Sequence, residues 1–412
     1  MKNSIWKKIC LALPLGLMAA EWDGCQTAWG QSRERNASVA TVSTFAEENL
    51  YDTQLLSPSA ACTVTGPRPA CTDATLGTIP QTLDTTPPSL ASPEAVFAPS
   101  PSLGSLSAGQ GALTAQNNVA ASLMPGGYLD PAAPATMFRL RYDTANDNRF
   151  PDRGEYFYAK CGCFRDPALA GALLDPNAKG PAGANTSVSY QEIRPYFEYA
   201  FNPRISVFTE LPVRFVSFDS IPGTGGLGDT GGFSDMNLGV KYALIAEEDR
   251  YLTLQTRTYL PTGHAGKGLG TANVSLEQSL LYYRRLSDHW LLQGQFTTFN
   301  PINGSDFASN VLQYGGGLGY LAHQGDTFSI IPTVEVVGWT FLNGKKFNPL
   351  DGVSSARGDT IINVKPGVRI GLGEGSGPAM MQRQSIYAGF GIPITGDQFY
   401  SDLFRVEYRM VF

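Results

Sequence analysis

The chain has 412 residues, of which 42% are hydrophobic and 16% are charged, and its formal net charge is -6. This acidic balance, without a basic cluster, excludes nucleic acid from the expected partners. The mean hydropathy of -0.12 is that of a soluble protein. A transmembrane β-barrel has the same average, because only every second residue of its strands faces lipid.

The amino terminus has the anatomy of a signal peptide. Lysines precede an apolar run at 9–20, which is too short to cross a bilayer as a helix. We place the cleavage after Gly30, and the alternative is lipidation at Cys25. No other stretch reaches the roughly 18 apolar residues of a membrane helix. If the mature chain spans a membrane, it does so as a barrel, since helices and closed barrels alone satisfy every backbone group in lipid.

Residues 31–130 form a leader rich in Ser, Thr, Ala, Pro and Gly, without alternation or helical period. Such a segment buries too little apolar surface to offset the entropy of ordering it. We predict a disordered spacer, and a tether to the cell wall or a partner is the alternative. The predicted domains are therefore a signal peptide at 1–30, the leader at 31–130 and a barrel at 131–412.

Four cysteines remain after the signal peptide, and in an exported chain we expect them to pair rather than to bind metal. Cys62 and Cys71 can close a small loop, whereas Cys161 and Cys163 are too close in sequence for an easy bridge to each other. No nearby His completes a zinc site, and we expect neither a metal nor a cofactor.

From residue 131 onward, segments with the two-residue alternation of β-strands recur regularly. The prediction is an all-β chain folded as an antiparallel up-and-down transmembrane barrel of about twelve strands. An even number places both chain ends at the periplasmic rim. The predicted strands are 136–144, 187–200, 203–217, 233–246, 249–261, 272–286, 289–300, 308–322, 326–339, 358–373, 382–394 and 402–412.

The connections between these segments alternate in length. Tight turns occur at 202–203, 247–249, 287–288 and 323–325, and long loops rich in Gly, Pro and Asp occur at 145–186, 218–232, 262–271 and 340–357. Short turns on the periplasmic rim and long loops outside are typical of outer-membrane barrels. The first long loop is long enough to fold over or into the mouth.

The last strand alternates apolar residues with Arg405, Glu407 and Arg409 and stops at Phe412. It resembles the carboxy-terminal assembly signal of bacterial outer-membrane barrels. That resemblance implies the outer membrane of a Gram-negative-type bacterium as the location, and outer-membrane lipid and the barrel-assembly machinery as partners. Phe412 would close the signal.

Two stretches carry a family resemblance. Residues 235–244 (DMNLGVKYAL) and 254–263 (LQTRTYLPTG) resemble a pattern of the outer-membrane proteins grouped with the meta-pathway phenol-degradation family. The resemblance covers roughly 187–412, and 138–163 is similar to the start of such proteins. It implies a transporter or channel, by analogy only.

The strand parity sets eleven cations and six glutamates toward the lumen, a surplus of about five positive charges. These charges either pair across the lumen or line a path that favours anions. We expect the first and last strands to pair, and we predict a constriction there and nearby, built by Arg139, Arg141, Arg257, Arg369, Arg405, Glu407 and Arg409. The full inward set adds Arg194, Arg214, Lys241, Arg285, Lys365, Glu192, Glu198, Glu210, Glu277 and Glu335.

The sequence offers no catalytic constellation. The three histidines, His264, His289 and His323, fall in a loop and at turns, and none has a Ser and a carboxamide at the spacing of outer-membrane phospholipases. We therefore predict a channel or transporter for small solutes, and the alternative is a structural barrel that anchors the envelope. The residues do not name the solute.

Overall fold

The computed structural model describes residues 121, 124–183, 185–220, 227–325, 327–372 and 383–412. The predicted signal peptide, nearly all of the leader, and Cys25, Cys62 and Cys71 lie outside the described residues. In the part of the chain that is described, no helix is long and apolar enough to cross a membrane.

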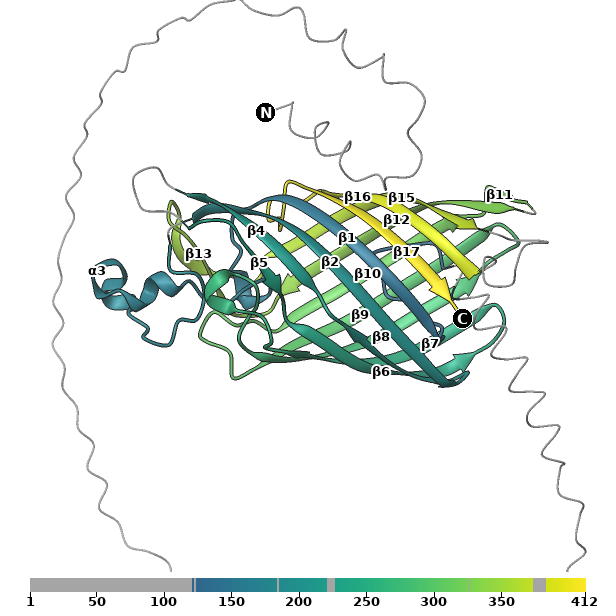
Figure 1. Ribbon diagram of the computed structural model, residues 1–412, viewed down its shortest axis with the longest axis horizontal. Coiled ribbons are helices and arrows are strands. Elements are labelled where there is room, and N and C mark those ends of the chain that lie inside the picture. Colours follow the sequence, from purple (N-terminus) through teal and green to yellow (C-terminus); the bar gives the residue numbers. More distant parts are fainter. Residues whose placement is uncertain (1–120, 122–123, 184, 221–226, 326, 373–382) are drawn as a thin grey trace, which may run out of the picture. The chain divides into compact units, whose positions relative to one another are not determined.

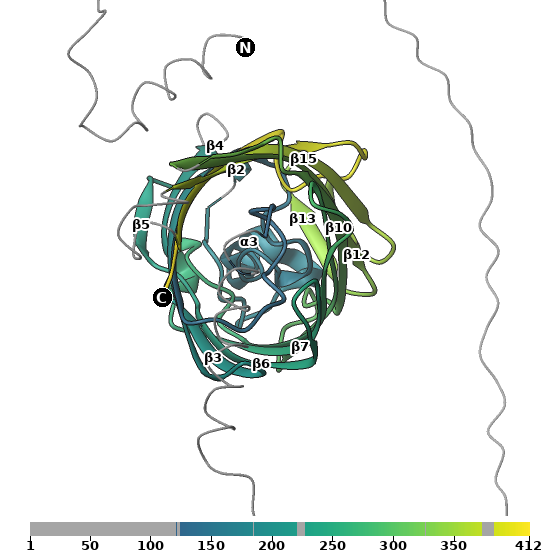
Figure 2. The same ribbon diagram turned by 90° about the vertical axis from the view of Figure 1, so that its right-hand side faces the viewer.

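The described chain forms a closed antiparallel β-barrel of twelve strands (Figures 1 and 2). Strand β1 (Met137–Asn148) pairs with β2 (Asn185–Asn202) on one side and with β17 (Asp402–Val411) on the other, which closes the sheet. The predicted fold is confirmed. Each of the twelve wall strands is here called a stave, and a stave can contain two labelled strands. The remaining staves are β3 (Ile205–Glu210) with β4 (Val213–Ser220), β5 (Thr230–Phe233) with β6 (Met236–Ala246), β7 (Arg250–Leu260), β8 (Val274–Arg285), β9 (Trp290–Ile302), β10 (Val311–Tyr320), β12 (Phe328–Phe341), β15 (Thr360–Leu372) and β16 (Gln384–Pro393).

Two staves are each broken into two labelled strands. The third breaks between β3 and β4 at Leu211 and Pro212, where proline has no N–H to give to the ladder. The fourth breaks opposite it, between β5 and β6, so that β4 pairs with β5 and β3 with β6. The two breaks therefore lie side by side, with the Ser234 N–H donating to Pro212 O at 2.9 Å.

The two rims differ as the sequence predicts. One carries short turns, with the two-residue strand β11 (His323–Gln324) added to β12, and the ends of β1 and β17 lie there because Met137 pairs with Val411. The other carries the long loops. These loops contain the short helices η1 (Arg153–Glu155), η2 (Gly162–Arg165), α3 (Pro167–Ala170), η3 (Gly171–Leu173) and η4 (Ala265–Lys267), and the hairpin β13 (Lys345–Asn348) to β14 (Gly352–Ser355).

Strand β17 shows how the alternation builds the barrel wall. Arg405, Glu407 and Arg409 are buried inside, whereas the apolar residues between them face outward. The same pattern leaves an apolar outer surface, with aromatic side chains near the short-turn rim, as in a barrel that meets lipid. These exposed rim aromatics are Tyr199, Phe201, Tyr242, Trp290, Tyr320 and Phe328.

The outer surface yields a first prediction. Val240 lies in the middle of β6 with 47% of its surface exposed. If this face contacts lipid, Val240→Arg should lower the free energy of unfolding by about 2–4 kcal/mol, the usual effect of a charge near the bilayer midplane. The measurement is urea unfolding of the protein folded in lipid vesicles. Leu350→Arg, in an exposed loop position, is the control, and equal effects of both variants would contradict the lipid-facing assignment.

Candidate functional site

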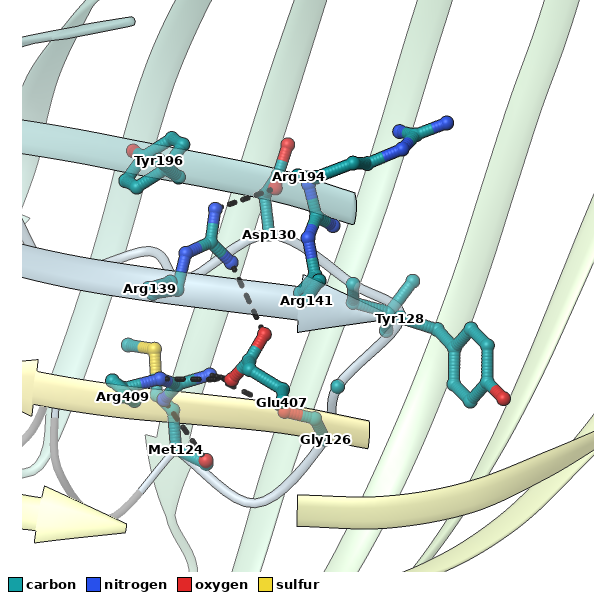
Figure 3. Close-up of polar contacts among 12 residues, drawn as sticks. Met124, Gly126, Tyr128, Asp130, Arg139, Arg141, Arg194, Tyr196, Glu407 and Arg409 are labelled. Carbon is teal, nitrogen blue, oxygen red and sulfur yellow. Dashed lines mark hydrogen bonds and ion pairs between the residues drawn. The ribbon is translucent and has the colours of Figure 1, made fainter. Parts of the chain in front are cut away.

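The lumen is filled by the segment just before the first strand. Residues 124–136, here called the plug, run inside the ring of strands (Figures 2 and 3). Met124, Leu129, Ala132, Ala133 and Ala135 are each at most 3% exposed. The plug makes no strand pairing, so its backbone groups need other partners. Its first residues fall within the predicted leader, whose end we had placed at Asp130.

One glutamate binds the plug through three successive backbone groups. The carboxylate of Glu335, on β12, accepts hydrogen bonds from the N–H groups of Gly127 at 3.1 Å, Tyr128 at 3.1 Å and Leu129 at 3.0 Å. It also accepts one from the side-chain amide of Gln293 at 2.7 Å. Successive N–H groups of this kind form a concave anion site. Glu335 is 0% exposed, and these contacts neutralise part of the cost of burying it.

Arginines of the wall bind the plug's carbonyl groups. Arg369 donates to Gly126 O at 2.8 Å, and Arg405 donates to Gly127 O at 2.6 Å. Arg409 donates to Met124 O at 3.3 Å (Figure 3). The plug therefore offers its N–H groups to an anion and its carbonyls to cations, over residues 124–129.

Asp130 anchors the centre of the plug by charge. Its carboxylate lies 2.6 Å from Arg257 Nη2 and 3.6 Å from Arg139 Nη2. Arg139 also reaches Glu407 at 3.8 Å, and Glu407 receives Arg369 and Arg409 at 2.8 Å each. Glu407 is thus the meeting point of three arginines beside the plug (Figure 3).

The seven predicted constriction residues all lie inside the barrel, and each has an oppositely charged partner. Three of the arginines, Arg139, Arg369 and Arg409, meet at Glu407, and Arg257 joins them through Asp130. Arg141 pairs with Glu210, and Arg405 pairs with Asp143 at 2.7 Å. The predicted pairing of the first and last strands produces the register Arg139 to Arg409 and Arg141 to Glu407. Phe412, the predicted assembly residue, lies at the short-turn rim with its side chain half exposed, and its role stays a prediction.

The charge surplus is smaller than the sequence predicts. Arg285 does not enter the lumen: its side chain is 37% exposed at the rim and lies 3.6 Å from Asp288. The sequence analysis also missed two lumen carboxylates, Asp130 and Asp143. Asp143 lies two residues after Arg141 on the same strand, so the alternation that placed Arg139 and Arg141 inward also predicts that Asp143 faces the lumen. Ten cations against eight carboxylates leave two positive charges, and the pairing interpretation describes most of the network.

A second body of chain closes the loop-side mouth. Residues 149–183, here called the loop cap, pack Tyr156 against Phe299 at 5.0 Å and Phe399 at 5.6 Å between ring centroids. The cap contains a disulfide between Cys161 and Cys163, which the sequence analysis judged too short to form easily. The turn of η2 brings the two Cα atoms to 5.2 Å, a separation that a disulfide can span.

A buried carboxyl joins the loop cap to the β13–β14 hairpin. Asp152 is 2% exposed and accepts a hydrogen bond from the Phe347 N–H at 3.0 Å. The pKa of Asp152 is raised to about 7, chiefly by burial and also by the charge of nearby Glu155, while backbone hydrogen bonds oppose the shift. The neighbouring Arg153 is engaged by Asp359 at 3.2 Å.

The histidines lie away from the lumen site. His289 stacks on Tyr320 and His323 packs against Phe328, both at the short-turn rim, and His264 lies in the β7–β8 loop. Within the described ranges, no group of three or more His, Cys, Asp or Glu side chains could hold a metal ion.

The Glu335 contacts yield a second prediction. Glu335→Gln removes the charge and turns one acceptor into a donor that faces backbone N–H groups. Hydrogen bonds to charged groups contribute about 1.5–3 kcal/mol each, so the plug should leave its place more often. A cysteine introduced at Tyr128 should react with a water-soluble maleimide at least several-fold faster in the Glu335→Gln background. Glu247→Gln, in an exposed turn, should leave the rate unchanged. Equal rates in the protein with the cysteine alone and in both glutamine backgrounds would show that Glu335 does not hold the plug in place.

Asp152 yields a third prediction, on pH. A carboxyl with a raised pKa in the folded state stabilises that state when it is protonated, and this contribution is lost as the pH rises through the folded pKa. The protection of the Phe347 amide against hydrogen exchange, corrected for intrinsic rate, should therefore fall between pH 5 and pH 8. Asp152→Asn should make the protection nearly independent of pH in this window. A fall of the same size in the variant would assign the effect to another group.

No family model matches the chain, and no curated protein matches it. Among solved structures, it is similar to the COG4313 outer membrane channel from Pseudomonas putida F1, with 15% identity and a TM-score of 0.42 over 70% of this chain and 100% of that one. It is also similar to the KdgM porin, with 7% identity and a TM-score of 0.31 over 66% and 99%. A third is LpxR from Salmonella typhimurium, with 12% identity and a TM-score of 0.37 over 66% and 100%. Likeness at these values assigns neither a solute nor an activity, and no family model supports the resemblance to the meta-pathway family.

Proposed function

We propose that this protein is an outer-membrane channel for small solutes, closed at rest by the plug and selective for anions. The apolar outer face, the polar lumen and the even number of strands support a place in the outer membrane. Insertion through the barrel-assembly machinery, with Phe412 in its signal, belongs to the same proposal. An enzymatic function is not proposed, because the polar groups of the lumen form ion pairs rather than a nucleophile with a base.

The observation that carries the proposal is the way in which the plug is held. Many of its contacts with the wall join a wall side chain to a plug backbone group, such as Glu335 to the N–H of Leu129 and Arg405 to the carbonyl of Gly127, and the ion pairs of Asp130 add to them. The barrel ladder closes without it, through the pairing of β1 with β17 and β2. The plug can therefore shift while every strand keeps its hydrogen bonds. Twelve strands lie between the eight of a barrel filled by its side chains and the sixteen of an open porin, which suits small solutes.

The anion preference follows from the charges that remain. The lumen carries two more cations than carboxylates, and low-dielectric walls concentrate the field of that excess along the path. Arg405 and Arg409 each contribute to this field and also bind plug carbonyls. A change at these positions should therefore alter both selectivity and the closed state.

An envelope anchor without transport is the second candidate. The completeness of the plug's contacts favours it, since Asp130, Glu335 and three arginines hold a short segment from both sides. The two candidates differ in one measurable property, because an anchor has no need to open.

Planar bilayer recordings give the fourth prediction. The double variant Arg405→Gln with Arg409→Gln should open more often than the wild type, and its reversal potential in a salt gradient should move toward that of a cation-selective pore. Arg250→Gln, which removes an exposed cation at a turn, should match the wild type. Circular dichroism and heat-modifiable migration report whether the barrel is intact. If the intact wild type and the intact double variant both never conduct, the anchor stands instead.

A further inference from the structure

A chamber lies between the plug and the loop cap. Its volume is about 200 Å³, and the plug contributes Tyr128 and Asp130 to its walls. Tyr156 and Phe157 of the loop cap cover it from the mouth side. The chamber is well below the roughly 300–1,000 Å³ of sites for drug-sized ligands, so it suits a molecule of about one ring.

One cation of the chamber has no carboxylate partner. Lys365, on β15, is 4% exposed, and no described carboxylate lies within 4.0 Å of its Nζ. Its neighbour across the β12–β15 ladder is Glu335, whose oxygens accept the N–H groups of the plug. The Lys365 ammonium instead lies 3.9 Å from the centre of the Tyr128 ring and 5.1 Å from that of Trp339.

The other cations of the chamber have carboxylate partners. Arg405 forms two hydrogen bonds with Asp143 at 2.7 Å, and Arg257 lies 2.6 Å from Asp130. Lys365 is therefore the position at which an incoming anion gains most. A buried ammonium that lies against aromatic rings and has no described carboxylate within 4.0 Å is stabilised further when an anion binds it.

The rest of the wall is aromatic to an unusual degree. Eight of the 22 residues around the chamber are Tyr, Phe or Trp, including Tyr128 and Trp339 beside the lysine. Aromatic rings pack against a planar ring edge to face or offset, and they do so at separations that a chamber of this size provides. A sugar or a long alkyl chain gains less from such walls.

We propose that the chamber binds a small aromatic monocarboxylate, with its carboxylate on Lys365 Nζ and its ring among the aromatic side chains. The proposal deepens the channel function and rests on it in so far as this ligand is a transported solute. The ligand would compete with the Tyr128 ring for the ammonium, and Tyr128 belongs to the plug. A solute of this class would thus contact the gate itself.

The test uses benzoate with the full mature chain in detergent, by titration calorimetry at constant ionic strength. Benzoate should bind, and benzamide, which keeps the ring but lacks the charge, should bind at least tenfold more weakly. Acetate, which keeps the charge but lacks the ring, should also bind at least tenfold more weakly. Lys365→Met should lose at least tenfold in benzoate affinity, whereas Lys365→Arg should keep most of it. Lys267→Met, which removes an exposed lysine from the β7–β8 loop, should bind as the wild type does.

Several results would overturn the proposal. Equal affinity for benzoate in the wild type and in folded Lys365→Met would remove the role of the lysine, and equal affinity for benzoate and acetate or chloride would remove that of the aromatic walls. If Lys365→Met does not fold, Val337→Phe enlarges a wall residue and leaves every charge in place, so it should weaken benzoate binding if the chamber is the site. Calorimetry measures binding independently of transport. A protein that conducts but does not bind benzoate would contradict the ligand proposal alone, and a protein that binds benzoate but never conducts would contradict the channel proposal alone.

Discussion

The interior depends on one exchange of hydrogen bonds, in which charged side chains of the wall and backbone groups of the plug serve as each other's partners. A buried carboxylate or guanidinium needs hydrogen bonds, and so does a backbone segment outside any sheet. Glu335 meets three plug N–H groups, while Arg369 and Arg405 meet plug carbonyls. Without the plug, the charged wall side chains would lose these hydrogen-bond partners, and without those side chains the plug backbone would lose its own. The plug therefore becomes ordered in the same step in which it fills the lumen.

This exchange also determines where the electrostatic excess lies. On a bare ladder, Glu335 and Lys365 are cross-strand neighbours and would neutralise each other. Because the carboxylate binds the plug, the ammonium has no carboxylate of the described chain within 4.0 Å and lies against the Tyr128 ring. A plug that moves away would release Glu335 to its lysine. In the channel that we propose, the closed state would present a positive site to the mouth and the open state would weaken it, which would favour release of a bound anion inward.

The sequence predicted the wall well because a barrel strand records its two faces at every second residue. Closure alone predicted that the first and last strands pair, and the register of that pairing sets Arg139 opposite Arg409. The plug was missed because its order comes from distant wall residues and not from any period of its own: Asp130 was assigned to a disordered leader, yet it lies between Arg139 and Arg257. Sequence parity could have found Asp143, but nothing in the sequence shows that Glu335 turns toward backbone rather than toward Lys365.

The loop cap adds a second closure with a different chemistry. Its contacts are aromatic stacking around Tyr156 and a carboxyl, Asp152, whose pKa burial raises to about 7. Ionisation of that buried group near neutral pH should destabilise the packing of the loop cap, while the plug's ion pairs, which involve arginine, keep their charge. In the channel that we propose, a solute from outside would meet two barriers in series, of which the outer would respond to pH and the inner to anions. Since the chamber lies between them, opening of the cap alone would admit a ligand to Lys365 without opening a continuous pore.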